Sequence, residues 1–226
     1  MNKSKIEWLD GGYSINPVKG WCPNPDCPLG EDCYARSLYR RFKWNPEIRF
    51  VKEKILMPTE PSKIFVGSTM ELFGDWIKPE WLKSIFGAVK CHSEHTFIFL
   101  TKKPENLARW SPFPRNCWIG VSVCNDEMFD RAMMEFHTGD IQASVQFISF
   151  EPLLSEISKN HYLPLRLKDT VNWIILGGRS VAHKFYPPEP WIQEIEDAAD
   201  KAGIPVFEKQ NLRKTWAKPP RREWPK

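Results

Sequence analysis

The chain has 226 residues, 42% of them hydrophobic and 27% charged, which is the composition of an ordinary soluble globular protein. It contains no run of 18 apolar residues, and its first residues carry charge with no apolar stretch behind them. The sequence therefore predicts neither a membrane-spanning helix nor a signal peptide, and it favours a cytoplasmic location, where thiols stay reduced. The net charge of +4 permits an acidic partner without requiring one.

Short apolar runs alternate with stretches of helical periodicity, a pattern typical of α/β proteins with parallel strands. The predicted strands are 13–16, 63–68, 96–100, 117–123, 145–150, 172–177 and 204–208. The predicted helices are 34–43, 79–91, 104–110, 126–137 and 190–202. Six or seven βα units fall short of the eight in a complete barrel, so both a partial TIM-like (β/α)6–7 barrel and an open doubly wound sheet are compatible. We favour the partial barrel, as a single domain over residues 1–226.

The last segment, about residues 209–226, concentrates Lys and Arg among Pro and Trp residues. Such a basic tail either contacts a nucleic acid or a partner protein, or is a solvated terminus. The chain also carries 11 Trp, 14 Phe and 5 Tyr. Most of these aromatic residues are expected to fill the core, although aromatic rings also stack on bases.

Three cysteines, Cys22, Cys27 and Cys33, lie within twelve residues on a loop rich in Pro and Gly. Three thiolates form a cradle for a metal ion or a cluster and leave one coordination position open for chemistry, whereas four usually close a structural site. The loop follows the first predicted strand, so it should lie at the carboxyl end of the sheet. The remaining cysteines are expected to be buried, inert thiols; they are Cys91, Cys117 and Cys124.

Polar residues follow most of the other predicted strands, at the edge where ligands bind in both candidate architectures. The segments are 67–71, 101–103, 122–126, 149–152, 177–179 and 208–210. Glu151 stands between Phe150 and Pro152, so its carboxylate must find a partner or act in catalysis. Lys102 is a candidate anion binder, and Gly177 would let a ligand approach the backbone.

Several segments of the chain resemble a phage- and prophage-associated three-cysteine-motif family of uncharacterised function. They are 5–8, 16–20, 33–35, 100–105, 118–123, 150–154, 174–178 and 207–210. That family is distantly similar to radical S-adenosylmethionine enzymes, including the spore photoproduct lyases. The resemblance implies a [4Fe-4S] cluster, S-adenosylmethionine as cofactor, and a nucleic acid or nucleotide as substrate.

The resemblance also assigns roles to individual residues. It implies that Cys22, Cys27 and Cys33 hold the cluster. The cofactor would lie against a set of residues at the strand ends, with Tyr34 beside the adenine; the set is Tyr34, Gly67, Ser68, Thr69, Glu71, Ser122 and Gly177. The resemblance places Glu151 where substrate-contacting polar groups usually lie; from its position after a strand we add Lys102, and we predict these two as the catalytic residues.

Other interpretations of the cysteine loop remain open. Its C-x4-C-x5-C spacing and the nearby Asp26, Glu31 and Asp32 also suit zinc, with His92 or His95 as a fourth ligand. The protein would then be a non-catalytic module, stapled by zinc, that binds a nucleic acid or a protein. An α/β enzyme without a metal, using Glu151 as base, is the third possibility.

Overall fold

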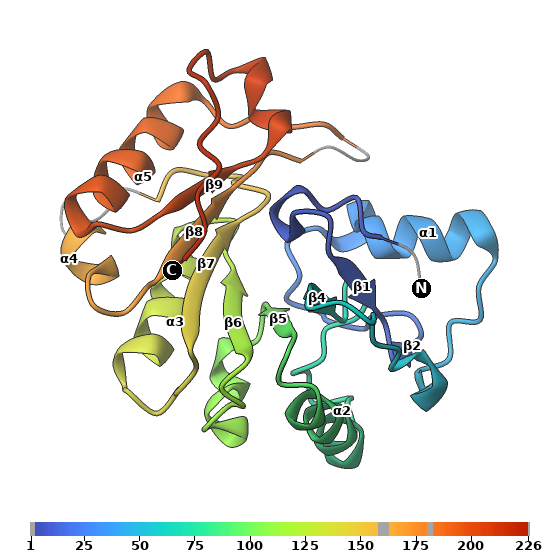
Figure 1. Ribbon diagram of the computed structural model, residues 1–226. Helices are drawn as coiled ribbons and strands as arrows, with labels where there is room; N and C mark the ends of the chain where they lie inside the picture. Colours follow the sequence, from blue (N-terminus) through green and yellow to red (C-terminus); the bar gives the residue numbers. More distant parts are fainter. Residues whose placement is uncertain (1–2, 158–162, 180–182, 226) are drawn as a thin grey trace.

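The computed structural model describes residues 3–157, 163–179 and 183–225, and its centre is a curled sheet of seven parallel strands in the order β1-β4-β5-β6-β7-β8-β9 (Figure 1). The strands are β1 (Tyr13–Ile15), β4 (Lys63–Val66), β5 (Thr96–Thr101), β6 (Cys117–Ser122), β7 (Val145–Phe150), β8 (Trp173–Leu176) and β9 (Val206–Glu208). Because the spatial order follows the chain order without a reversal, the sheet is a partial barrel and not a doubly wound sheet. The predicted fold class is confirmed.

Helices connect the strands and cover the outer face of the sheet (Figure 1). They are α1 (Tyr34–Phe42), α2 (Pro79–Cys91), α3 (Asp126–His137), α4 (Leu163–Leu167) and α5 (Glu189–Ala202). Their sequences supply ordinary helix signals: Pro79 occupies the first turn of α2, and the side chain of Asn125 accepts a hydrogen bond from the backbone N–H of Met128 at the start of α3. No described helix is both long and apolar enough to cross a membrane.

Three local features differ from the sequence-based expectation. Residues 104–110 form two 3-10 turns, Pro104–Asn106 and Ala108–Trp110, because seven residues with a leading proline are too few to nucleate an α-helix. A two-stranded ribbon of β2 (Val18–Lys19) and β3 (Arg49–Phe50) was not predicted, since two-residue strands carry no readable periodicity. The helix α4 was not predicted either, because its five residues are too few to show a helical periodicity.

The inside of the half-barrel is filled by an aromatic cluster rather than by solvent. Trp173 on β8 is fully buried there, and its ring contacts those of Trp118, Phe147 and Phe207 at centroid distances of 5.8, 5.4 and 6.4 Å. The ring of Phe147 also occupies the space beside Gly120, where a Cβ atom would come within 2.3 Å of it. The apolar residues of a parallel sheet thus face two separate cores, one against the helices and one inside the curl.

The two ends of the described chain meet across this inner cluster. Trp224 packs on Phe207, and its indole N–H donates a 2.9 Å hydrogen bond to the carbonyl oxygen of Trp8. Arg222 forms a 2.8 Å ion pair with Glu7. The basic tail is therefore packed against the domain over its described residues, with Lys226 lying outside them.

A pair of buried carboxyl groups joins α5 to β9. Glu196 is 6% exposed and Glu208 is fully buried, and their carboxyl groups share a hydrogen bond, while the other oxygen of Glu208 accepts the backbone N–H of Arg221 at 2.9 Å. Burial, with the hydrogen bond and charge of Glu208, raises the pKa of Glu196 to about 8 from its ordinary 4.5. At neutral pH the folded protein therefore holds a proton on this pair that the unfolded chain releases.

This proton makes the stability pH-dependent. Because the folded pKa is raised, the free energy of unfolding is expected to fall as the pH rises from about 4.5 to about 8. Glu196→Gln, which keeps the hydrogen bond without ionising, should be more stable than the parent at pH 9 by several degrees in Tm, with the gap closing near pH 5. Thermal melts at pH 5, 7 and 9 measure this, with Glu194→Gln on the same helix as control. An equal gap at all three pH values would contradict the assignment.

Candidate metal centre

The three predicted ligand cysteines lie on a loop between β2 and α1, at the rim formed by the carboxyl ends of the sheet strands. We call this rim the mouth. All three thiols are free and partly exposed. The loop is anchored at its start by a hydrogen bond of 2.6 Å from the backbone N–H of Gly20 to the hydroxyl of Tyr39 on α1. It ends in a 3-10 turn over Gly30–Asp32, after which Cys33 leads directly into α1.

The thiol of Cys22 is subject to opposing influences from its surroundings. Burial raises the pKa of its thiol, and the charges of Glu71 and Cys33 act in the same direction, while hydrogen bonds from the backbone amides of Asn24 and Glu71 oppose them. An N–H group directed at sulfur is a common means of tuning a metal-bound thiolate. The contact also joins the cysteine loop to the segment that follows β4.

That segment, residues 67–71, contains four of the predicted cofactor residues and is held in a fixed shape. Gly67 has a φ of +84°, which side-chain-bearing residues rarely adopt. The side-chain oxygen of Asn16 accepts hydrogen bonds from the hydroxyl of Ser68 at 3.2 Å and from the backbone N–H and hydroxyl of Thr69 at 3.0 and 3.1 Å. Asn16, directly after β1, thus organises the segment, and its position at a strand end was the signal that could have identified it.

The carboxylate of Glu71 accepts hydrogen bonds from residues at the end of β5. One oxygen accepts the hydroxyl of Thr101 at 2.6 Å and the N–H of Phe73 at 3.1 Å, and the other accepts the N–H of Lys102 at 2.8 Å. These bonds fix the end of β5 beside the cysteine loop. The structure therefore gives Glu71 a positioning role, whereas its predicted cofactor contact stays a prediction.

Lys102 follows β5 and is electrostatically coupled to cysteines at the mouth. Burial opposes its positive charge, but Cys124, Cys27, Glu71 and Cys33 together outweigh burial and raise the pKa of its ammonium group. The charges of these groups therefore favour the cationic form of Lys102.

Cys124 was expected to be an inert core thiol. It lies two residues after β6, at the carboxyl end of the sheet. It is fully buried, and burial raises its pKa to about 11, although the nearby Lys102 acts against this shift. Its position directly after a strand was the signal that could have placed it at the mouth. Together with Cys27 and Cys33 it is one of three cysteines whose charges act on Lys102.

Two ion-paired contacts hold the cysteine loop from opposite sides. Asp26, next to Cys27, pairs with Lys103 at the end of β5. Asp32, next to Cys33, pairs with Arg179 beyond β8 at 3.4 Å and with His183 at 3.1 Å. β1 and β9 are the two edge strands of the sheet. The Asp32–Arg179 contact joins the loop that follows β1 and β2 to the segment that follows β8, and so it connects the two sides of the open half-barrel. The loop is thus fixed in place across the mouth.

Glu151 and Gly177 form the far side of the mouth. Glu151 follows β7 and pairs with Lys209, the first residue after β9. Gly177 lies beneath this pair: a Cβ atom there would be 3.1 Å from Lys209 and 3.2 Å from Glu151. The carboxylate predicted to need a partner therefore has one, and the absence of a side chain at Gly177 makes room for the pair.

The last two predicted residues are placed differently from each other. Ser122 is buried at the end of β6 in register with Ser149, whose hydroxyl has no hydrogen-bond partner among the described residues. Tyr34 is 44% exposed at the first position of α1, beside Cys33, and burial of its hydroxyl end raises its pKa. The first lines the interior end of the mouth and the second its outer rim.

The spacing of the cysteine sulfurs distinguishes between metals. In a tetrahedral site with Zn–S bonds of 2.3 Å, two sulfurs stand about 3.8 Å apart. Among the described residues, no group of three potential ligand atoms that includes these cysteines lies within 4.8 Å of one another. The three sulfurs therefore do not all lie as close together as the ligands of one zinc ion. Its all-thiol donor set fits a cluster, whose bridging sulfides separate the thiolates.

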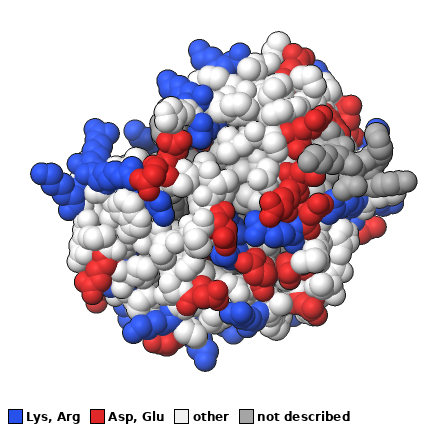
Figure 2. Space-filling model, turned by 180° about the vertical axis from the view of Figure 1, so that it is seen from behind, with Lys and Arg blue, Asp and Glu red and all other residues white. Residues whose placement is uncertain are grey.

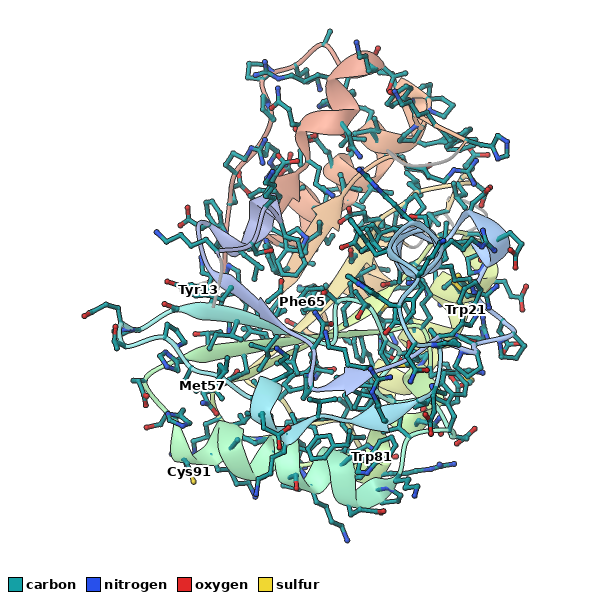
Figure 3. The ribbon with its side chains drawn as sticks, turned by 90° about the vertical axis from the view of Figure 1, so that its right-hand side faces the viewer. Tyr13, Trp21, Met57, Phe65, Trp81 and Cys91 are labelled. Atoms are coloured by element: carbon teal, nitrogen blue, oxygen red, sulfur yellow. The ribbon has the colours of Figure 1, made fainter. Side chains whose placement is uncertain are left out.

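The idea that His92 or His95 completes a zinc site with these cysteines is wrong. Both histidines precede β5, whereas the cysteine loop lies by its carboxyl end, and a strand of this length separates the two ends by roughly 17 Å. Figure 3 shows the same separation, with Trp21 of the cysteine loop and Cys91 at the end of α2 on opposite sides of the molecule. The zinc alternative thus lacks its proposed fourth ligand.

Fold and site together define an α/β half-barrel whose mouth is lined by thiols and ion-paired polar residues. By sequence the chain belongs to a family described as protein of unknown function (DUF5131), which it matches over residues 3–219. No curated protein matches it. The resemblance to phage-associated proteins and to radical enzymes is not part of that family description and stays a prediction.

Solved structures of spore photoproduct lyase resemble the chain at low identity. A mutant with bound AdoMet and dinucleoside spore photoproduct is 14% identical, with a TM-score of 0.49, over 84% of this chain and 62% of that chain. A complex with dinucleoside spore photoproduct is 13% identical, with a TM-score of 0.49, over 90% of this chain and 64% of that chain. The chain thus spans less than two thirds of the length of these structures.

Proposed function

We propose that this protein is an iron–sulfur enzyme of the radical S-adenosylmethionine type that acts on a nucleic acid or a nucleotide. The observation that carries the proposal is the arrangement of three free thiols on one fixed loop at a mouth lined by Lys102, Glu71 and Glu151. Cys22, Cys27 and Cys33 would hold three irons of a [4Fe-4S] cluster. With S-adenosylmethionine on the open iron, this cluster would supply the electron that breaks a carbon–sulfur bond of the cofactor.

The chain's own residues would orient the cofactor and keep the site rigid. The backbone of 67–69, fixed by Asn16, offers polar groups next to Cys22, and Tyr34 offers a ring next to Cys33 for the adenine. Ser122 and Gly177 would form the inner wall. This preorganisation matters because a reactive cofactor must be held against its substrate with water excluded.

Glu151 and Lys102 would face the substrate. The Glu151–Lys209 pair holds a carboxylate and an amine together at the mouth, where a proton can be exchanged between substrate and carboxylate. The Lys102 cation would balance the negative charge that thiolates bring into the site. We also propose a cytoplasmic location, because the mechanism requires reduced thiols.

The surface next to the mouth supports a nucleic acid or nucleotide as substrate. Helix α1 begins directly after Cys33. Tyr34 and Phe42 at its two ends and Trp44, two residues beyond it, are 44%, 51% and 45% exposed. Figure 2 shows Lys and Arg side chains projecting from the side of the molecule where α1 lies. Basic groups interleaved with exposed aromatic rings are typical of surfaces that bind single-stranded nucleic acid.

The aromatic rings and guanidinium groups of this surface are arranged so that bases could stack on them. The rings of Phe42 and Trp44 stack at 5.4 Å, and the guanidinium of Arg41 lies 5.3 Å from the centre of the Phe42 ring. On the other side of the helix, Arg36 and Arg40 both lie 5.3 Å from the ring of Trp21, the residue before Cys22. A strand bound along α1 would therefore run toward the cysteine loop.

Anaerobic reconstitution tests the enzymatic proposal. Protein incubated with ferrous iron and sulfide is expected to bind about four irons per chain and turn brown. With a reductant and S-adenosylmethionine it should then release 5′-deoxyadenosine, measured by chromatography. Stoichiometric zinc in place of iron, or an intact cluster that yields no 5′-deoxyadenosine, would overturn the proposal.

A binding measurement tests the substrate class. The double variant Arg41→Ala/Lys43→Ala should bind a fluorescent single-stranded oligonucleotide roughly tenfold more weakly at low salt and with a shallower salt dependence, because phosphate contacts are lost. Both side chains are exposed, so the fold should be unaffected. Lys83→Ala/Lys90→Ala on α2 removes the same charge elsewhere and serves as the matched control. Equal loss in both variants would show that only net charge matters.

A further inference from the structure

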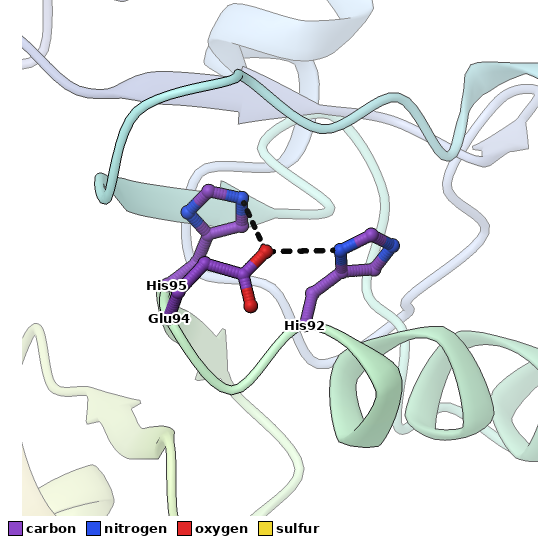
Figure 4. A group of neighbouring side chains, drawn as sticks. All are labelled: His92, Glu94 and His95. Atoms are coloured by element: carbon purple, nitrogen blue, oxygen red, sulfur yellow. Dashed lines mark hydrogen bonds and ion pairs between the residues drawn. The ribbon is translucent and has the colours of Figure 1, made fainter.

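A second cluster of metal-ligating side chains lies at the other end of the sheet from the mouth. His92, Glu94 and His95 occupy the short turn between α2 and β5 (Figure 4). The cysteine loop and the function proposed above make no use of them. Their three ligand atoms all lie within 4.8 Å of one another.

The distances within the cluster match those between the ligands of one small ion. Oε1 of Glu94 lies 3.2 Å from Nδ1 of His92 and 3.5 Å from Nε2 of His95. Figure 4 shows this oxygen between the two imidazole rings. In a tetrahedral zinc site with bonds of 2.0–2.1 Å, neighbouring ligand atoms stand about 3.3 Å apart. Both distances to the carboxylate thus match this spacing, and the two imidazole nitrogens lie within 4.8 Å of each other.

His95 provides a second observation that points to a ligand at this turn. The residue is 1% exposed, and neither of its ring nitrogens has a hydrogen-bond partner among the described residues. Nδ1 thus has no polar contact and Nε2 has only the 3.5 Å ion-pair contact with Glu94. A buried imidazole satisfied so weakly is costly, and such a group usually has an ion or a water at its nitrogen. Its Nε2 is directed toward Glu94, where an ion shared with His92 would satisfy it.

The turn is held in shape by a residue outside it. The side-chain amide of Asn116, just before β6, donates to the carbonyl oxygens of Val89, His92 and His95 at 3.1, 3.0 and 3.2 Å. These bonds fix both histidine backbones without using either imidazole. The side chains are therefore preorganised as ligands at little cost in entropy.

The donor set and the exposure of the cluster indicate which ion would bind. Two imidazoles and one carboxylate suit zinc and similar divalent transition metals, and three protein ligands leave a fourth position free. Glu94 also lines an open cavity of about 370 Å³ with Asp10, Lys63 and Thr96, so water can reach the ion. We propose that His92, Glu94 and His95 form a zinc site with one open position, separate from the cysteine centre.

Zinc titration tests this site in the full chain. The test uses a variant, called the serine host, in which Cys22, Cys27 and Cys33 are replaced by serine to remove the thiol ligands. Calorimetry should show that the serine host binds one zinc per chain. Its Tm should rise by about 5–10 °C when it is saturated with zinc. His92→Ala and Glu94→Gln in this host should abolish both effects. His137→Ala, which removes an exposed histidine at the end of α3, should leave them unchanged.

The result that overturns the proposal is a host that binds no zinc, or that binds it equally well after His92→Ala. Should the serine host fail to fold, the parent chain carries the same test: His92→Ala is then expected to bind one zinc fewer per chain than the parent by metal analysis. His92 is chosen because its side chain is 40% exposed, so removing it leaves no buried cavity. No loss of zinc in this comparison would equally overturn the site.

Discussion

Replacing Cys33 by serine is expected to abolish the iron–sulfur cluster, reducing bound iron after reconstitution to the background level and 5′-deoxyadenosine formation at least a hundredfold. Three thiolates are the minimum that holds a cluster with an open iron, and serine oxygen is a poor substitute for a soft thiolate ligand. Cys33 leads into α1 by its backbone, and its side chain makes no capping hydrogen bond, so helix formation should not suffer. Iron analysis and visible absorption measure the result.

Cys91→Ser is the matched control for this prediction. Cys91 is an exposed cysteine at the end of α2, on the opposite side of the molecule from the cysteine loop (Figure 3). The variant should retain full iron content and activity. Iron content that survives Cys33→Ser, or that falls equally in both variants, would remove the loop from the proposed centre.

Truncating Trp173 is expected to produce the largest loss of stability of any single substitution in the inner cluster. Its ring is fully buried among Trp8, Trp118, Phe147 and Phe207, and its N–H donates to the carbonyl oxygen of Glu223 at 2.8 Å. Trp173→Ala should cost about 3–5 kcal/mol of unfolding free energy, from lost burial and the cavity left behind. Denaturant titration followed by circular dichroism measures this.

Two further variants separate the causes of that loss. Trp173→Phe keeps most of the apolar ring and should cost much less, chiefly the lost hydrogen bond of about 1 kcal/mol. Trp44→Ala, at a ring that is 45% exposed, should change the stability by less than about 1 kcal/mol. A loss for Trp173→Ala as small as that for Trp44→Ala would mean that the inner cluster does not contribute to the core as described.

The strands were predictable because the sheet is buried on both faces. Mainly apolar, β-branched and aromatic runs such as 145–150 are typical of strands covered on both faces, and polar residues directly after them identify the mouth. What the sequence could not show were the contacts between distant segments. Asp32 and Arg179 are 147 residues apart, and nothing local to either indicates that they pair.

Cys124 and His95 illustrate the same limit in opposite directions. Cys124 follows an apolar strand and reads as an ordinary core thiol, yet the curl of the sheet brings it beside Lys102 and Cys27. His95 is a plausible metal ligand that the sequence allows beside the cysteines, yet it lies directly before the strand that Lys102 follows. In each case the direction of a strand, which fixes the end at which a side chain emerges, decided the outcome.

The hydrogen bond between Trp224 and Trp8 connects residues that are 216 positions apart. Closing so long a loop is entropically expensive and comes late in folding. During synthesis, Trp8 and the aromatic cluster beneath it remain without their final cover until residue 224 has left the ribosome. The inner aromatic core is therefore completed only when segments 216 positions apart in the chain come together.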